Sequence, residues 1–194
     1  MIEVKKLYQI TYDQIISFGT TLYSSESRYE IKRQVSGDEI SFKMTLVQNT
    51  DNYVKYTSSN LITEDNYNLI IDHGYSLGAF HEDKMIGYMI AEDRKWNNSV
   101  WIEMIRVAKD YKGYGIGSSM LSTLESLSKE CFKRSIEIET QNMNVPAINF
   151  YKKNGFIFTG LNMTLYDPEE CDDEIAVYMS KDIEQSYIPP GTMH

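Results

Sequence analysis

The clearest alternation of apolar and polar residues lies in the middle of the chain. Two apolar runs, at 75–80 and 85–91, flank the polar turn 81–84, and this arrangement is typical of a β-hairpin. A second polar turn at 94–99 leads into a third apolar run at 100–107. The pattern therefore predicts three consecutive strands in this part of the chain.

Helical and strand patterns then alternate. Met120, Leu124, Leu127 and Cys131 follow one another at spacings of four, three and four residues, which places them on one face of a helix. Residues 136–140 alternate between apolar and polar side chains, as expected of a strand.

A second helix is predicted from its end signals. Asn144 is a suitable N-cap, Pro146 falls in the first turn, and Asn154 with Gly155 would close the helix. The remaining pattern predicts two closing strands, at 156–166 and 174–180. The acidic loop 167–174 lies between them.

The first 70 residues are harder to interpret. Residues 2–7 have a strand pattern, and Thr11 and Gln14 have the spacing of a capping box that opens a helix. Residues 24–68 are polar and mixed, without a dominant period. Within them we expect only a short strand or helix at 40–46 and a helical turn at 60–67.

A glycine-rich turn joins the strand at 100–107 to the first predicted helix. Gly113, Gly115 and Gly117 stand at every second position, so a phosphate oxygen could approach the backbone N–H groups directly. The following helix adds unpaired N–H groups and the positive end of its dipole. This segment predicts a pyrophosphate-binding turn.

The spacing of the turn excludes two common nucleotide sites. A P-loop requires Gly-x-x-x-x-Gly-Lys-Ser/Thr, and the segment from Gly113 to Ser119 has no lysine at that place. A dinucleotide fingerprint requires Gly-x-Gly-x-x-Gly close to the strand end. Here the pattern is Gly-x-Gly-x-Gly, and five residues separate Val107 from the first glycine.

The segment Lys112-Gly-Tyr-Gly-Ile-Gly117 resembles the acyl-CoA turn, Arg/Gln-x-x-Gly-x-Gly/Ala, of the GCN5-related N-acetyltransferase (GNAT) family. The resemblance extends through Ile105-Arg-Val107 before the turn and through 144–156 after it, and it covers about residues 75–180. Four further segments are similar to the streptothricin acetyltransferase branch of this family, at 94–97, 101–103, 138–141 and 163–166.

This resemblance implies the fold and the domain organisation. The expected fold class is α/β (α+β), the GNAT fold, with a mixed central sheet of about seven strands that is splayed at the acetyl-CoA groove and flanked by helices. Residues 1–185 would form a single N-acetyltransferase domain, and residues 186–194 a flexible C-terminal tail.

The resemblance also implies acetyl-CoA as co-substrate and no metal. Pantetheine would pair with the strand at 105–107, and the backbone of 113–118 would hold the pyrophosphate. Lys112 stands where the family has arginine or glutamine, so it keeps a charge but lacks planar, multi-donor geometry, which predicts weaker affinity. The implied cofactor-binding residues are Ile105, Arg106, Val107, Lys112, Gly113, Tyr114, Gly115, Ile116, Gly117, Ser118, Asn144, Ala147 and Tyr151.

Two residues are the catalytic candidates. Tyr151 occupies the family's general-acid position, and a phenol with a pKa of about 10 is well matched to a departing alkyl thiolate. Glu103 is the candidate general base; Glu139 on the neighbouring strand and deprotonation through water are alternatives. Asn144 would either contact pantetheine or only cap its helix.

Composition limits the partners. The formal net charge of −9 argues against generic nucleic-acid binding and is compatible with a cationic substrate. Cys131 and Cys171 lack metal-ligand spacing and are expected to be free thiols. Apolar runs too short to span a bilayer, and an N-terminus without a secretory signal pattern, indicate a cytoplasmic protein without membrane association.

The leading functional hypothesis is direct acetyl transfer to a primary amine of a small cationic acceptor of the streptothricin type, without a covalent enzyme intermediate. A protein amine or a polyamine is an alternative acceptor, and a catalytically silent acyl-CoA sensor is an alternative of another class. A homodimer is compatible with the sequence. The acidic loop 167–174 would be either a solvated loop or a wall that attracts the cation, and Trp96, Trp101 and Tyr166 would line the acceptor pocket or pack.

Overall fold

The computed structural model describes residues 1–56, 64–167, 169, 171 and 174–184. The first part of the helical turn expected at 60–67, several positions of the acidic loop and the expected tail at 186–194 lie outside the described residues.

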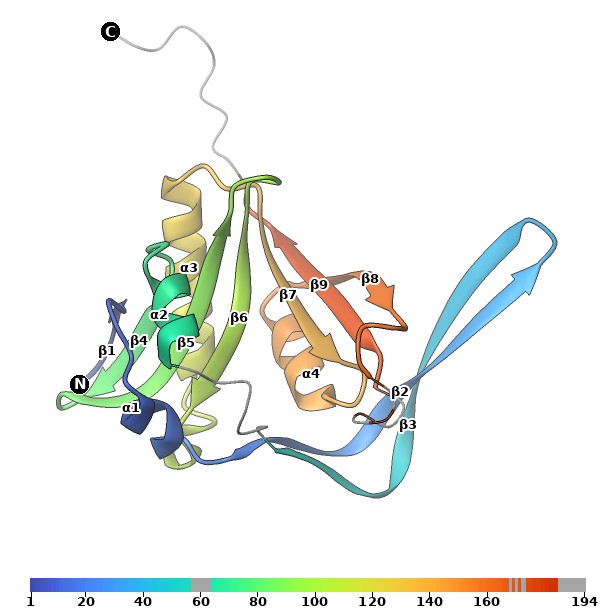
Figure 1. Ribbon diagram of the computed structural model, residues 1–194, viewed down its shortest axis with the longest axis horizontal. Coiled ribbons are helices and arrows are strands. Elements are labelled where there is room, and N and C mark those ends of the chain that lie inside the picture. The colour runs from blue at the N-terminus through green and yellow to red at the C-terminus, as the bar shows by residue number, and fades with distance from the viewer. Residues whose placement is uncertain (57–63, 168, 170, 172–173, 185–194) are drawn as a thin grey trace, which may run out of the picture. The chain divides into compact units, whose positions relative to one another are not determined.

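Seven strands form one mixed sheet, and two further strands form a separate ribbon (Figure 1). The order in the sheet is β1-β4-β5-β6-β7-β9-β8, and the pairs β1–β4, β4–β5, β5–β6 and β8–β9 are antiparallel. The seven-strand prediction is therefore confirmed. The strands in sheet order are β1 (Ile2–Lys6), β4 (Leu77–His81), β5 (Lys84–Arg94), β6 (Ser99–Val107), β7 (Ser135–Gln141), β9 (Ala176–Asp182) and β8 (Ile157–Asn162).

The closing strands differ from their predicted bounds. β8 ends at Asn162 rather than at residue 166, because the Asn162 side chain accepts a hydrogen bond from the Thr164 N–H at 3.0 Å and turns the chain. β9 begins at Ala176 rather than at residue 174, and the Glu174 side chain forms an ion pair described below.

The helices begin and end close to the predicted residues. At the start of α1, Thr11 and Gln14 form the predicted capping box: each side chain accepts a hydrogen bond from the other residue's N–H. α3 ends at Glu130, so Cys131, expected on its buried face, is instead the exposed C-cap. The helices are α1 (Tyr12–Ser17), α2 (Glu64–Ile71), α3 (Ile116–Glu130) and α4 (Val145–Lys153), with a 3-10 turn η1 (Lys109–Tyr111).

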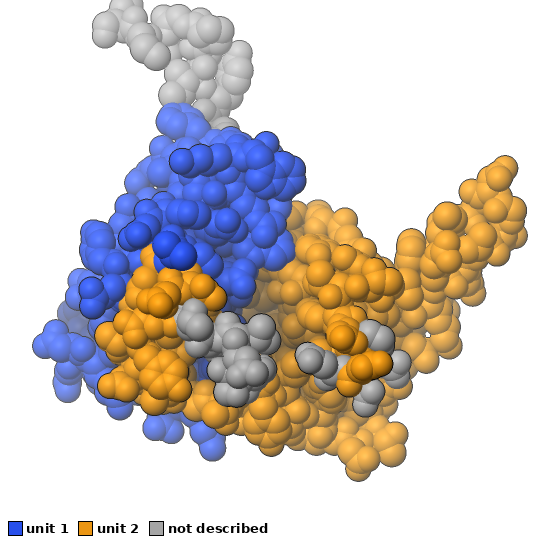
Figure 2. All heavy atoms as spheres, viewed as in Figure 1, with its two compact units in different colours: residues 1–9, 69–137, 181–194 blue, residues 10–68, 138–180 orange. Residues whose placement is uncertain are grey.

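The chain divides into two compact units (Figure 2). Unit 1 comprises residues 1–9, 69–137 and 181–194, and α3 packs there against β1, β4, β5 and β6. Unit 2 comprises residues 10–68 and 138–180, and α4 packs there against β2. The expectation of a single domain over residues 1–185 stays a prediction.

Each unit has its own buried apolar side chains. The core of unit 1 includes Ile86, Ile90, Met120, Leu124 and Ile136, all at most 1% exposed, and the core of unit 2 includes Ile10, Ile148, Val177 and Met179, all 0% exposed.

A long β-ribbon occupies the region that had no readable pattern. β2 (Thr21–Ser36) and β3 (Glu39–Tyr56) pair antiparallel, and a two-residue loop, Gly37-Asp38, joins them. Gly37 has a φ of 59°, which the first position of a type II′ turn requires. The expectation of only a short strand or helix at 40–46 is therefore wrong: that segment lies in the first half of an 18-residue strand.

Within the described residues, no helix is both long enough and apolar enough to cross a membrane.

Candidate functional site

The glycine-rich turn has an open backbone. The Ala108 N–H donates to the Ile86 carbonyl at 2.9 Å and fixes the end of β6, and η1 follows. Gly113 and Gly115 have φ values of 86° and 79°, in the left-handed region that favours glycine. A Cβ added at either glycine would meet no protein atom within 4 Å, so this side of the turn faces open space.

The helix that follows the turn begins without a side-chain cap. Its N-cap is Gly115, and the first helical hydrogen bond runs from the Ser119 N–H to the Gly115 carbonyl at 2.9 Å. The N–H groups of residues 116–118 therefore have no acceptor within the helix, and the first turn carries no acidic side chain. The geometry presents several N–H donors and the positive end of a helix dipole to an anion, which fits a pyrophosphate.

Two predicted residues of this turn are on its surface. Lys112 is exposed, and Tyr114 is 75% exposed. Tyr111 has an internal partner instead, since its hydroxyl lies 3.0 Å from Nδ1 of His81.

The strand before the turn is interrupted by a β-bulge. Ile90 pairs with Met104 and Ala91 pairs with Ile102, so Glu103 is the extra residue on β6. Its side chain is exposed, and its carboxylate accepts a hydrogen bond from Nε1 of Trp101 at 3.1 Å. A bulge changes the direction of a side chain, and this one presents the candidate base to solvent.

After the bulge, the side chains of β6 alternate again. Ile105 and Val107 are half-buried, whereas Arg106 is buried opposite Tyr88 of β5. Burial raises the pKa of Tyr88, and the neighbouring Arg106 charge partly offsets that rise. The Arg106 side chain is therefore committed to this interior contact.

The remaining candidates lie on α4 in unit 2. Oδ1 of Asn144 accepts a hydrogen bond from the Ala147 N–H at 3.2 Å, so the capping role of Asn144 is observed. Tyr151 is 5% exposed, and its ring contacts the rings of Phe150 and Phe156 at centroid distances of 5.2 and 5.3 Å. Burial, and then the charge of Glu139, raise the pKa of Tyr151.

Glu139, the alternative base, has a phenolic partner. Its carboxylate accepts a hydrogen bond from the Tyr166 hydroxyl, which in turn accepts one from Nε2 of Gln141 at 2.8 Å. Burial and the Glu139 charge raise the pKa of Tyr166. Tyr166 thus stays protonated at neutral pH and holds the carboxylate on β7.

The acidic loop is not simply a solvated charge run at its end. The Glu174 side chain is fully buried and forms an ion pair with Nζ of Lys55 at 2.9 Å. It also accepts a hydrogen bond from the Tyr53 hydroxyl, and Nζ of Lys55 lies 3.4 Å from Sγ of Cys171. The charge of Glu174 is therefore balanced within unit 2. Glu174 is neither a solvated loop residue nor a free negative charge that could attract a cationic acceptor.

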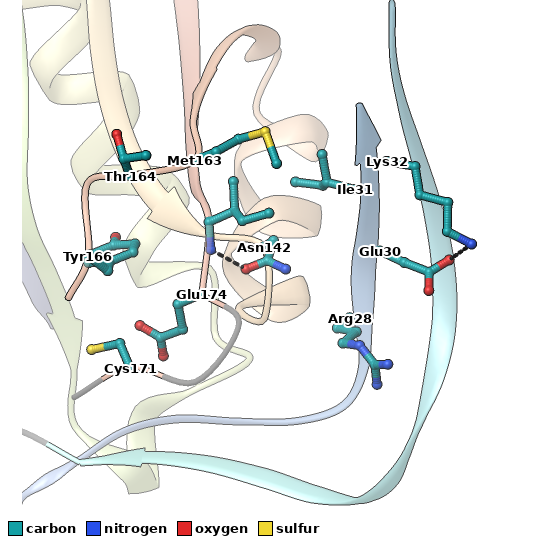
Figure 3. A pocket seen from close by; sticks show the side chains of 11 residues that line it. Arg28, Glu30, Ile31, Lys32, Asn142, Met163, Thr164, Tyr166, Cys171 and Glu174 are labelled. Carbon is teal, nitrogen blue, oxygen red and sulfur yellow. Dashed lines mark hydrogen bonds and ion pairs between the residues drawn. The ribbon is translucent and has the colours of Figure 1, made fainter. Parts of the chain in front are cut away.

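Unit 2 contains a cavity of about 520 Å³ (Figure 3). Charged side chains of β2 line it on one side, and Tyr166, Cys171 and Glu174 line it on the other. Of the three aromatic residues considered for an acceptor pocket, Tyr166 lines this cavity. Trp96 is 83% exposed, and Trp101 packs under the guanidinium of Arg94 at 3.6 Å.

Sequence reasoning did not identify Asn142, which joins three segments of unit 2. Its Oδ1 accepts the Ile175 N–H at 2.8 Å, and its Nδ2 donates to the Tyr29 carbonyl at 3.0 Å. A polar residue directly after a strand was the only signal, and it does not reveal partners that are distant in sequence. Among the described residues, no group of three His, Cys, Asp or Glu side chains is arranged to hold a metal ion.

Comparison with known sequences agrees with this geometry. The sequence profile of the acetyltransferase (GNAT) family matches residues 43–156. Streptothricin acetyltransferase of Streptomyces lavendulae is 33% identical over 96 residues, which is 50% of this chain and 51% of that protein. Streptothricin acetyltransferase A of Bacillus subtilis (strain 168) is 36% identical over 83 residues, 43% of this chain and 48% of that protein. The chain thus spans about half the length of the curated relatives that it matches.

Solved structures share the fold over nearly the whole chain. The crystal structure of nourseothricin acetyltransferase superposes with a TM-score of 0.74 at 21% identity, covering 94% of this chain and 99% of that one. A Bacillus anthracis structure, determined in complex with acetyl coenzyme A, has a TM-score of 0.69 at 24% identity with the same coverage. The family profile covers more than half of the sequence, and the same fold recurs in these structures. The chain therefore belongs to the acetyltransferase (GNAT) family.

Proposed function

We propose that this protein transfers the acetyl group of acetyl-CoA to a primary amine of a small cationic acceptor of the streptothricin type. The observation that carries the proposal is the open turn at 113–118, where glycines and an uncapped helix start present N–H groups to an anion. Similarity to two streptothricin acetyltransferases supports the choice of acceptor.

The backbone N–H groups of 113–118 would bind the pyrophosphate, and the backbone of 105–107 would pair with the pantetheine amides. Hydrogen bonds to charged groups contribute about 1.5–3 kcal/mol each, so a handful of them accounts for micromolar affinity. Asn144 and Ala147 are also proposed to contact the cofactor. This part of the proposal is supported by the order along the chain of the glycine-rich turn and the segment 144–156.

In the proposed reaction the acceptor nitrogen attacks the thioester carbonyl carbon, the C–S bond breaks, and the thiolate takes a proton. Tyr151 is the proposed donor of that proton, because it occupies the family's general-acid position and its phenol is protonated at neutral pH. Glu103 is the proposed acceptor of the amine proton, since the bulge leaves its carboxylate exposed to solvent. Glu139 is the second candidate for this role, although it already accepts the Tyr166 hydroxyl.

A polyamine is the second candidate acceptor. A protein of Bacillus subtilis subsp. natto named as a probable spermine N(1)-acetyltransferase is 30% identical over 92 residues, 43% of this chain and 60% of that protein. The net charge of −9 favours cationic acceptors of both kinds. We further propose a cytoplasmic location, where acetyl-CoA is available.

The acceptor is tested by measuring coenzyme A release with streptothricin, spermine and a peptide with a free α-amine. We expect streptothricin to give the highest kcat/KM. A higher value with spermine would favour the polyamine enzyme, whereas saturable acetyl-CoA binding without turnover on any amine would favour a silent acyl-CoA sensor.

A further inference from the structure

The β2–β3 ribbon has one apolar face and one polar face. Register pairs on the apolar face are Tyr29 with Leu46, Ile31 with Met44, Arg33 with Phe42 and Val35 with Ile40. The alternate pairs are polar or charged except for Val47: Arg28 with Val47, Glu30 with Thr45, Lys32 with Lys43 and Gln34 with Ser41. A two-stranded ribbon of this kind is marginally stable in water on its own, so its apolar face requires a packing partner.

Among the residues of unit 2 that the structure describes, only those near the root of the ribbon contact its apolar face. The Tyr29 ring contacts the Phe158 ring edge-on at 6.0 Å, and Ile31 points toward Met163 across the cavity that both line (Figure 3). Farther out the same face is bare: Val35 and Ile40 are each 56% exposed, Phe42 49% and Leu46 51%. Figure 2 shows this outer part of the ribbon standing clear of the rest of unit 2.

The bare face continues onto the body of unit 2. Phe158 lies on β8, the edge strand of the sheet, and is 37% exposed, and Met163 beyond it is 42% exposed. Because these two residues meet the root of the ribbon through Tyr29 and Ile31, they extend its apolar face rather than forming a separate patch. We define the ribbon patch as Val35, Ile40, Phe42, Leu46, Phe158 and Met163.

We propose that a second copy of this chain covers the ribbon patch, so that the protein forms a two-fold dimer through its ribbons. Six half-exposed side chains of about 150 Å² each present on the order of 450 Å² of apolar surface per copy, within the range of the largest patch on a typical monomer, which is often functional. Since interfaces are about 60% apolar, this corresponds to roughly 750 Å² per copy, close to the roughly 800 Å² per partner of a stable interface.

Charge favours a second copy meeting at the ribbon rather than elsewhere. Residues 28–46 carry four basic and three acidic side chains, a net charge of +1, whereas the whole chain carries −9. Two ribbons therefore meet with little electrostatic repulsion, although the two whole chains repel each other. With a net charge of only +1, the ribbon lacks the cluster of basic side chains that binds an anionic membrane surface.

The two strands also suit a symmetric contact. They run antiparallel and carry the same apolar spacing, so a two-fold axis across the ribbon places the patch of one copy on the patch of the other. Such a contact is closed and does not propagate into filaments.

The oligomeric state of the full chain tests this proposal, measured by sedimentation velocity at roughly 50 μM, where a standard-size interface is populated. We expect the wild type at twice the chain mass of 22.5 kDa. Phe42→Glu should sediment as a monomer, because a carboxylate in the middle of the patch would be buried without a partner. Ser41→Glu, the adjacent residue on the polar face, is the matched control and should stay dimeric.

A variant with a shortened ribbon tests the proposal independently, in case Phe42→Glu misfolds. Replacing residues 33–42 by Asn-Gly connects Lys32 to Lys43, which are register partners, so the remaining strands keep their pairing. This variant should be a folded monomer by circular dichroism and sedimentation. A wild type that remains monomeric, a shortened ribbon that still dimerises, or dissociation of Ser41→Glu to the same extent as Phe42→Glu would overturn the proposal.

Discussion

At the scale of single residues, unit 2 holds several tyrosines in their protonated form. Tyr151 is enclosed by Phe150 and Phe156, and the nearby Glu139 carboxylate adds to the effect of burial on its pKa. Both effects oppose the phenolate, because an anion there would be desolvated and would face a second negative charge. A phenol in this environment is a weaker acid than a thiol, so proton transfer to the departing thiolate is uphill and depends on the two groups lying within hydrogen-bond distance.

Replacing Tyr151 by phenylalanine removes the proposed proton donor and keeps the ring. We expect Tyr151→Phe to lower kcat at least about tenfold, within the range of general-acid contributions, while the Kd for acetyl-CoA changes little. Steady-state kinetics and calorimetric titration measure the two quantities. Tyr56→Phe, at an exposed tyrosine, is the control, and equal kcat values in both variants would remove Tyr151 from the mechanism.

Single residues also mark the limit of prediction from sequence. The capping roles of Thr11 and Asn144 follow from local spacing alone, and both were predicted. The bulge at Glu103 depends on how β5 pairs with β6, and the ion pair of Glu174 depends on Lys55, 119 residues away. Sequence patterns record neither the register of a partner strand nor a distant contact.

At the scale of elements, the sequence predicts the start of α3 well and does not predict the β2–β3 ribbon. The glycine spacing and the apolar face of α3 are local signals, and the structure has the helix close to the predicted position. The ribbon was missed although residues 29–35 and 40–46 alternate and a Gly-Asp pair lies between them. Arg33 interrupts the apolar positions of the first strand, and polar residues dominate the remainder of 24–68, so no apolar period stands out over the whole region.

Gly115→Ala adds a methyl group to the turn, and it should affect both the stability of the fold and the binding of acetyl-CoA. We expect Gly115→Ala to lower the free energy of unfolding by about 1–2 kcal/mol, since alanine is strained at a φ of 79°. We also expect the acetyl-CoA affinity to fall at least about tenfold, the equivalent of one hydrogen bond to a charged group. Urea unfolding and calorimetry measure these changes.

Gly19→Ala is the matched control for this experiment. Gly19 has the same φ of 79° and an equally open Cβ position, but it follows α1 and is not part of the turn. It should lose similar stability without weaker acetyl-CoA binding. Equal loss of affinity in both variants would mean that strain, and not access to the turn, weakens binding.

At the scale of the whole molecule, the buried tyrosines predict a loss of stability in alkali. Burial is the main cause that raises the pKa of Tyr23, Tyr151 and Tyr166 in the folded state, whereas the unfolded phenols titrate near 10. Above about pH 10 the unfolded chain therefore binds fewer protons than the native state, so the free energy of unfolding falls as the pH rises. Urea unfolding should give a constant value between about pH 7 and 9 and a steep decline by about pH 11. A flat profile to that pH would show that these phenols ionise normally.

Thermal unfolding with and without ligands tests acyl-CoA binding at the turn most directly. At a free concentration of about 100 times Kd, acetyl-CoA should stabilise the protein by about 2.7 kcal/mol, which raises the Tm of a chain of this size by roughly 5–11 °C. NAD and ATP at the same concentration should leave the Tm unchanged, because the turn lacks the spacing of either nucleotide site. A rise in Tm with NAD or ATP but none with acetyl-CoA would contradict acyl-CoA binding at residues 112–118.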